Sequence, residues 1–203
     1  MNKDNLIYGV IGLLSGIIIG IFIAPTVAPQ SGYMGMMWRG GNSQTMSGEV
    51  DEHFIEQMIP HHEGAIAMAE LALERSARPE IRSLAEDIVD AQTKEIIQMK
   101  SWYREWFGSD VSEYNSVGMG MMMGGGHMVA FEGDLDELVE AEDFDLEFIR
   151  QMIPHHEMAI MMASMLKASS ERKEMQELAG QIITSQSREI DMMRSWYADW
   201  SNR

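Results

Sequence analysis

Two pairs of adjacent histidines are the residues of this chain best suited to chemistry. His61 and His62 lie in the stretch QMIPHHEGAIAMA, and His155 and His156 lie in a near copy, QMIPHHEMAIMMA. Imidazole nitrogen binds copper and other transition metals, and the thioether sulfur of a nearby methionine is a soft ligand that selects Cu(I) and similar ions. The repeated pattern favours metal binding over its alternative, a buried hydrogen-bond network that sets the register of the helices.

The two histidines of each pair point in different directions if they lie on a helix. At about 100° per residue, His62 falls in the middle of an apolar stripe, whereas His61 falls at the edge of that stripe, beside Met68. We therefore predict that His61 and His155 are accessible soft-metal ligands. We predict that His62 and His156 are buried side chains held by carboxylates.

A proline precedes each histidine pair within the same apolar pattern. Pro60 and Pro154 each remove one backbone donor and crowd the carbonyl four residues earlier. We expect each helix to kink or to restart at its proline, which would re-aim both imidazole rings.

The expected partners of these histidines lie on a later helix of each motif. Gln92 and Glu95 fall inside an otherwise apolar stripe, and Gln186 and Glu189 repeat them. Because buried polar groups need hydrogen-bond partners, we expect Glu95 to bond one histidine of the first pair and Glu189 one histidine of the second. A carboxylate that fixes the tautomer and orientation of an imidazole is the usual support behind a metal ligand.

The duplication extends well beyond the histidine motifs. Residues 51–106 align on residues 145–200 without a gap, and half of the aligned pairs are identical. Each unit holds two apolar stripes at helical spacing, joined by a short connection that suits an antiparallel hairpin. The predicted helices span about residues 49–74, 79–107, 143–168 and 172–200.

The repeat predicts the fold, because two hairpins can bury each other's apolar faces while one hairpin alone cannot. The predicted class is all-α, a four-helix bundle with pseudo-twofold symmetry between the hairpins. The bundle occupies residues 49–203. It consists of repeat one at 49–107, a Met- and Gly-rich loop at 108–132 and repeat two at 143–203.

The start of the chain predicts a membrane segment. Residues 6–23 form an uncharged apolar run that just reaches the length of a membrane-spanning helix. We assign residues 1–28 to a transmembrane anchor, with a cleaved signal segment as the alternative, and residues 29–48 to a Gly/Met-rich tether. Either assignment carries the rest of the chain across the membrane, into a periplasm or to the cell exterior.

Composition narrows the classes of partner. The formal net charge of −17 argues against nucleic acid and against anionic membrane surfaces. The absence of cysteine removes thiolate sites and disulfides, which leaves methionine and histidine as the soft ligands. The acidic run at 132–145 lacks the ligand spacing of a calcium loop, so we predict that it contains helix starts.

Methionine is unusually abundant, with 21 in the chain. Several lie in the Gly-rich loop, where no apolar stripe needs completing, so core packing does not explain them. We predict auxiliary metal ligands in this loop at Met119, Met121, Met122, Met123, His127 and Met128.

The histidine motif and the helix that follows it resemble the signature of a bacterial family known as domain of unknown function 305. The similarity covers roughly residues 49–203 and rests on FIEQMIPHHEGAIAMA followed by LAEDIVDAQTKEIIQMKSWY. It implies a ferritin-like four-helix bundle that is exported or membrane-anchored, and some members are linked to periplasmic copper binding and resistance. By this resemblance the candidate copper ligands are His61, His62, Met58, Met68, His155, His156, Met152 and Met162.

Three functions are compatible with these residues. We favour a membrane-anchored protein that captures Cu(I), with Ag(I) and Cu(II) as alternatives, for sequestration, resistance or handover to a copper-handling protein. The runner-up is a di-metal oxidase that would join His62, Glu95, His156 and Glu189, although the Glu-x-x-His pairs of such sites are missing. The third is a metal-free structural bundle. No nucleophile with evident partners and no phosphate-binding loop is recognisable, so we predict no catalytic residues.

Overall fold

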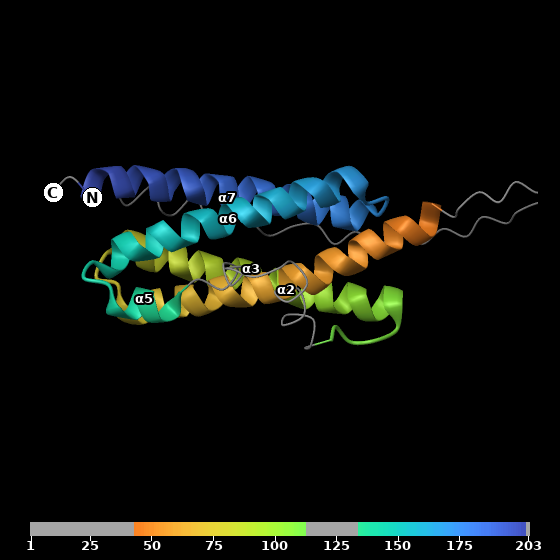
Figure 1. Cartoon of the computed structure of the whole chain (residues 1–203), viewed down its shortest axis with the longest axis horizontal. Helices are drawn as coiled ribbons and strands as arrows, with labels where there is room; N and C mark the ends of the chain where they lie inside the picture. The colour runs from red at the N-terminus through yellow and green to blue at the C-terminus, as the bar shows by residue number, and fades with distance from the viewer. Residues whose placement is uncertain (1–42, 113–133, 202–203) are drawn as a thin grey trace, which may run out of the picture. The chain divides into compact units, whose positions relative to one another are not determined.

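The structure, a computed structural model, describes residues 43–112 and 134–201. Within these two ranges the chain forms helices and the connections between them, and no strand. The helices are α2 (Ser43–Arg75), α3 (Pro79–Phe107), α5 (Leu135–Glu140), α6 (Phe144–Ser169) and α7 (Lys173–Trp200) (Figure 1).

Some of the predicted features fall outside this part of the chain. The membrane segment at 6–23 and the auxiliary ligands of the Met/Gly loop, residues 119–128, lie outside the described residues. Among the helices that are described, none is long and apolar enough to cross a membrane.

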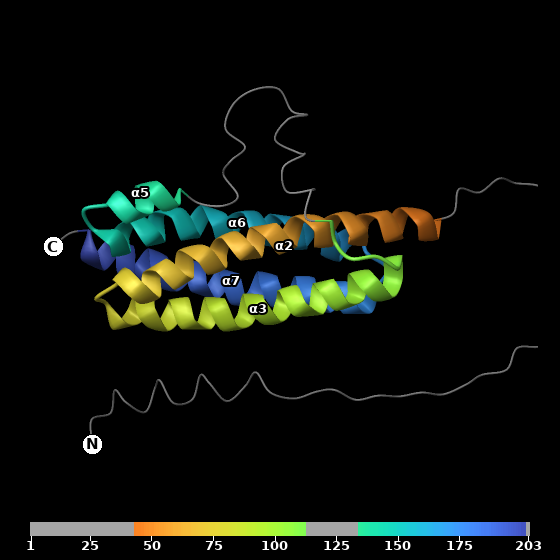
Figure 2. The same ribbon diagram turned by 90° about the horizontal axis from the view of Figure 1, so that it is seen from below.

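Two antiparallel hairpins build the bundle. α2 packs along α3 and α6 packs along α7, and the hairpins meet where α2 lies against α6 (Figure 2). Pro79 stands at the first turn of α3, where the missing backbone donor would have had no partner within the helix. Gly108 ends α3 in the left-handed conformation, at φ 73°, which glycine adopts without strain. The predicted all-α four-helix bundle is confirmed.

The core of the bundle consists of two apolar clusters, one towards each end. The first joins side chains that include Ile55 of α2, Met99 of α3 and Leu166 of α6. The second includes Ile88 of α3 and Phe148 of α6. The polar residues of the sequence motifs come between these clusters along every helix of both hairpins.

The connection between the two helices of each hairpin contacts the other hairpin near the start of that hairpin's first helix and near the end of its second helix. Arg78, just before α3, donates hydrogen bonds to Asp143 and Asp145 at the start of α6, and its guanidinium lies 4.5 Å from the centroid of the Trp200 ring. Arg172, the repeat equivalent, donates to Asp51 at 3.0 Å and lies 4.3 Å from the ring of the equivalent tryptophan. The two repeats are therefore joined by a symmetric pair of arginine contacts as well as by their apolar faces.

The helix bounds depart from the sequence expectations in two places. α2 begins at Ser43, so residues 43–48 are helical although we assigned them to the tether. These residues carry no apolar stripe, so the helix predicted from the spacing of apolar residues begins after them. α5 was not predicted as a separate helix. Its Leu138 is fully buried in the second apolar cluster, and polar contacts with Arg150 and Gln151 of α6 also hold it on the bundle.

The prolines do not restart their helices. α2 is continuous through Pro60, and α6 is continuous through Pro154. A proline in a helix interior removes one hydrogen bond, but the helical φ of proline is itself favourable. Apolar burial on both sides of each proline keeps the helix together across the missing bond. Of the two expected outcomes the restart is wrong, and the kink stays a prediction.

Candidate metal centre

A layer of polar side chains crosses the bundle between the two apolar clusters. Each of the four long helices contributes two residues to it, and all but Glu95 are buried. We call it the histidine layer; its members are His61, His62, Gln92, Glu95, His155, His156, Gln186 and Glu189.

One histidine of each pair is held by a carboxylate. The Nε2 of His62 bonds Glu95 Oε2 at 2.7 Å, and the Nε2 of His156 bonds Glu189 Oε2 at the same 2.7 Å. Both rings are completely buried. This confirms the predicted His–Glu pairing and the prediction that the carboxylate-held histidine is the one at the centre of the apolar stripe.

The carboxylate bond leaves a lone pair on the other nitrogen of each ring. A carboxylate accepts the hydrogen bond from Nε2, so in the neutral form of each ring Nδ1 is the nitrogen that has a lone pair. Among the described residues, Nδ1 of His62 and Nδ1 of His156 are buried and have no hydrogen-bond partner. A buried acceptor without a partner is costly, and coordinating a metal ion would satisfy it.

The other two histidines meet at the contact between the hairpins. The ring centroids of His61 and His155 are 3.8 Å apart with the rings tilted by 47°. His61 is 1% exposed and His155 is 4% exposed, so the prediction that they are accessible is wrong. The helical wheel placed His61 at the edge of the stripe of α2, but α6 covers that edge.

Burial also decides the charge of this histidine pair. Burial lowers the pKa of His61, and together with the neighbouring imidazoles of His155, His62 and His156 it brings this pKa to about 2. His61 is therefore neutral at physiological pH. Neutral imidazole is the form that binds a metal ion, so the ring needs no deprotonation before it can act as a ligand.

The four methionines predicted as ligands are buried on the same helices. Met58 precedes His62 by one helical turn, and Met152 precedes His156 in the same way, so each pair shares a helix face. Met68 and Met162 are also buried, within the apolar clusters. Core packing alone would bury all four, so their role as ligands stays a prediction.

The layer also contains amide oxygens without partners. Among the described residues, Oε1 of Gln92 and Oε1 of Gln186 are buried and accept no hydrogen bond. In the same part of the chain, no three His, Asp or Glu side chains form a group arranged to hold a metal ion. The candidate ligand set is accordingly a mixed one, with thioether sulfur of Met58 and Met152 beside imidazole nitrogen.

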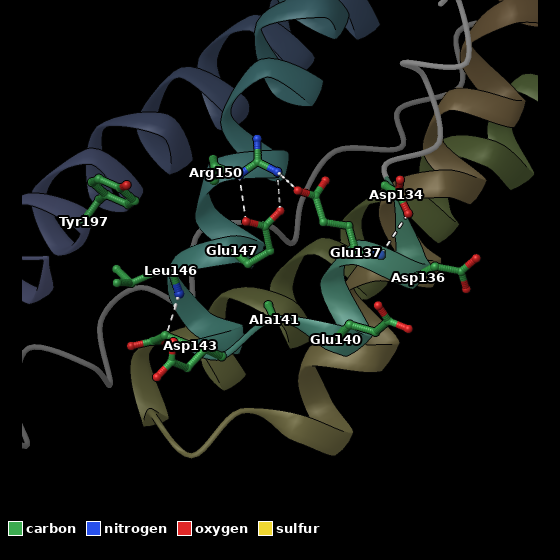
Figure 3. A pocket seen from close by; sticks show the side chains of 11 residues that line it. Asp134, Asp136, Glu137, Glu140, Ala141, Asp143, Leu146, Glu147, Arg150 and Tyr197 are labelled. Carbon is green, nitrogen blue, oxygen red and sulfur yellow. Dashed lines mark hydrogen bonds and ion pairs between the residues drawn. The ribbon is translucent and has the colours of Figure 1, made fainter.

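An acidic surface hollow lies away from this layer, between α5 and the start of α6. In Figure 3, Asp134 and Asp143 contact the first turns of α5 and α6, and Glu137 and Glu147 point towards Arg150. Asp136 and Glu140 point away from that arginine. Asp134 caps α5, and Asp143 caps α6. Hydrogen bonds from Arg150 hold the pKa of Glu147 below its usual range. These contacts fit the prediction that the acidic run forms helix starts.

Comparison with known proteins places the chain among helical proteins of one family. The family model described as domain of unknown function (DUF305) matches residues 51–197. The solved structure of CopM in the Cu(II)-bound form is 47% identical, with a TM-score of 0.63, and the match covers 74% of this chain and 98% of that one. CopM has also been solved in apo, Cu(I)-bound and Ag-bound forms.

Two further relatives share less of the sequence. A DUF305 fragment from Deinococcus radiodurans is 30% identical, with a TM-score of 0.60, and the match covers 74% of this chain and 96% of the fragment. The uncharacterized protein L153 of Acanthamoeba polyphaga mimivirus is 41% identical over 51 residues, which are 25% of this chain. This match spans only 34% of the viral protein.

Proposed function

The chain belongs to the DUF305 family, and we propose that it binds copper ions through the histidine layer. Cu(I) is the favoured ion, with Ag(I) and Cu(II) as alternatives, because imidazole and thioether are the ligands that the layer can supply. The proposed role is binding for sequestration, resistance or handover to a copper-handling protein, without a catalytic step.

This proposal rests on the two His–Glu pairs, His62 with Glu95 and His156 with Glu189. In each pair the carboxylate holds the ring by its Nε2, and Nδ1 is buried without a hydrogen-bond partner among the described residues. A purely structural network would be expected to use both nitrogens of a buried ring. The relatives of known structure support a soft metal as the missing partner, since CopM has been solved with Cu(I), with Cu(II) and with silver.

The close pair of His61 and His155 adds two imidazole rings to the layer, and the charge of His61 suits a ligand. The lowered pKa of His61 keeps its ring neutral, so a monovalent cation that enters the layer meets no positive charge on this ring. Two carboxylates, those of Glu95 and Glu189, border the same layer and would offset the charge of the ion. Charge balance thus favours a cation over an empty layer.

We propose that the bundle works outside the cytoplasm. Residues 6–23 would anchor it in the membrane, and the Met-rich loop, with Met119, Met121, Met122, Met123, His127 and Met128, would collect ions for the histidine layer. A strong negative net charge, −17 over the chain, attracts cations to its surface and suits a protein that concentrates them.

Titration of metal-free protein with Cu(I) against a competing chelator tests the proposal. We expect at least one tightly bound ion per chain. The double variant His61→Gln with His155→Gln should bind copper at least about tenfold more weakly, since loss of even a supporting contact to a metal site commonly costs 10–100-fold. Glutamine keeps much of the side-chain volume and removes both ring nitrogens.

The matched control is His53→Gln, which removes an exposed histidine from the same helix. Its copper affinity should equal that of the unchanged protein. Circular dichroism of each variant shows whether the bundle is retained. Binding of less than one tight ion per chain, or equal affinity in the double variant and the control, would refute the proposed function.

A further inference from the structure

The outer face of α6 exposes methionine. Met161 is 49% exposed and Met165 is 57% exposed, which makes them two of the most exposed large apolar side chains among the described residues. Met158 is half-buried on the same helix and packs against the first apolar cluster. We call these three residues the methionine stripe.

The stripe lies on one narrow face of the helix. With about 100° of rotation per residue, Met158, Met161 and Met165 fall within an arc of about 60° over two turns. Side chains three and four positions apart are neighbours on a helix surface, and each methionine has three rotatable bonds between its backbone and its methyl group. The three sulfur atoms can therefore converge on one ion.

The first repeat lacks this stripe, although its α2 is the equivalent of α6. The positions equivalent to Met158, Met161 and Met165 are occupied by Gly64, Ala67 and Leu71. α2 folds with those residues, so the fold does not require methionine at these positions. The second copy thus carries two exposed methionines, Met161 and Met165, that the packing of the hairpin does not explain.

The stripe also borders the histidine layer. On the helical wheel of α6, Met162 and His155 lie on the side of Met158 that faces away from Met161. Measured from Met158, buried Met162 is rotated by about 40° and His155 by about 60°. Methionine side chains are consequently present on α6 from its exposed face to the edge of the histidine layer.

We propose that Met158, Met161 and Met165 form a second, solvent-accessible binding site for a soft monovalent ion, Cu(I) or Ag(I). Three thioethers and no charged ligand would select soft monovalent ions over Zn(II) and Cu(II). In this proposal the ion binds first at the methionine stripe and then enters the histidine layer. Only this transfer to the layer rests on the proposed function; binding at the stripe does not.

Titration with Ag(I) tests the stripe, because Ag(I) is diamagnetic and does not change its oxidation state. In protein labelled with ¹³C at the methionine ε-methyl groups, the methyl signals of Met158, Met161 and Met165 should shift within the first equivalents of Ag(I). The variant Met161→Ala with Met165→Leu restores the residues of the first repeat and should lose that response. This variant keeps only Met158 of the stripe, and the affinity of that residue for Ag(I) should be about tenfold lower or more.

Two further variants separate this site from the histidine layer. Met192→Leu removes a half-buried methionine of α7 and should leave the stripe signals and their Ag(I) dependence unchanged. His61→Gln with His155→Gln alters the layer, and there the stripe methyl groups should still shift. Both results support a site that stands apart from the layer.

The outcomes that overturn the inference are distinct from those that overturn the proposed function. If Ag(I) shifts histidine signals of the layer while the stripe methyl groups stay in place, the stripe is not a site and the proposed function stands. An unchanged Ag(I) response after Met161→Ala with Met165→Leu has the same meaning. If no methyl or histidine signal responds, both proposals are wrong.

Discussion

Acidification should destabilise the metal-free protein through His61. This ring is buried and its pKa is lowered to about 2, from 6.5 for a free histidine, by burial and then by the three neighbouring histidines. Below pH 6.5 the unfolded chain binds a proton at this position that the folded chain does not. Stability is therefore fully present above pH 6.5 and is lost as the pH falls towards 2.

The size of this loss depends only weakly on the folded-state pKa. Proton linkage at one site with an unfolded pKa of 6.5 costs about 0.1 kcal/mol at pH 7.5 and about 2 kcal/mol at pH 5.0, provided that the folded-state pKa is well below 5. The substitution His61→Gln removes this site. We expect the variant to lose about 2 kcal/mol less stability than the unchanged protein over this pH interval.

Urea denaturation of metal-free protein at pH 7.5, 6.5 and 5.0, followed by circular dichroism, measures the effect. The comparison is between two changes with pH, so the absolute stability of the variant does not enter. His53→Gln, an exposed histidine on α2, supplies the background. Equal pH dependence in His61→Gln and in the unchanged protein would refute the argument that burial keeps this ring neutral.

Three further predictions concern the supports of the site and the fold. Glu95→Gln should weaken copper binding about tenfold or more, as measured by chelator competition, because it removes the carboxylate that orients its histidine, whereas exposed Glu63→Gln should have no effect. Arg172→Ala should lower the free energy of unfolding by about 2 kcal/mol, because it leaves a buried aspartate without its cation; Arg194→Ala, in an exposed pair, should cost under about 1 kcal/mol in the same urea experiment. Gly108→Ala should cost about 1–2 kcal/mol by thermal denaturation, solely because of its positive φ, since nothing crowds the added methyl group.

Much of the fold could be predicted from the sequence because it follows from local patterns. The apolar stripes gave helices whose bounds agree closely with α3, α6 and α7, and the duplication required two equivalent hairpins. Glu95 and Glu189 could be recognised as partners of histidines because a carboxylate inside an apolar stripe needs a donor. The helical start at Ser43 and the short α5 were missed, since neither has a periodic apolar pattern of its own.

The arrangement at the centre of the site could not be predicted in this way. A helical wheel gives the direction of a side chain about the axis of its own helix, but not which other element covers that direction. His61 lies at the edge of its stripe and is nevertheless buried, because His155 of α6 packs on its ring. The contact of Arg172 with Asp51, 121 positions away, was likewise invisible, because nothing in either local pattern requires it.

The sequence by itself determined the repeat, the helices and the chemical types in the histidine layer, because each of these depends on residue type and spacing along one chain segment. The pairing of His62 and His156 with carboxylates also followed from their place in the apolar stripe, and the structure confirms it. Only the tertiary structure decided that His61 and His155 are buried against each other between the hairpins, and that Met161 and Met165 stay exposed. The physical reason is that burial and pairing depend on the approach of a second helix, and that approach is set by the packing of the whole bundle.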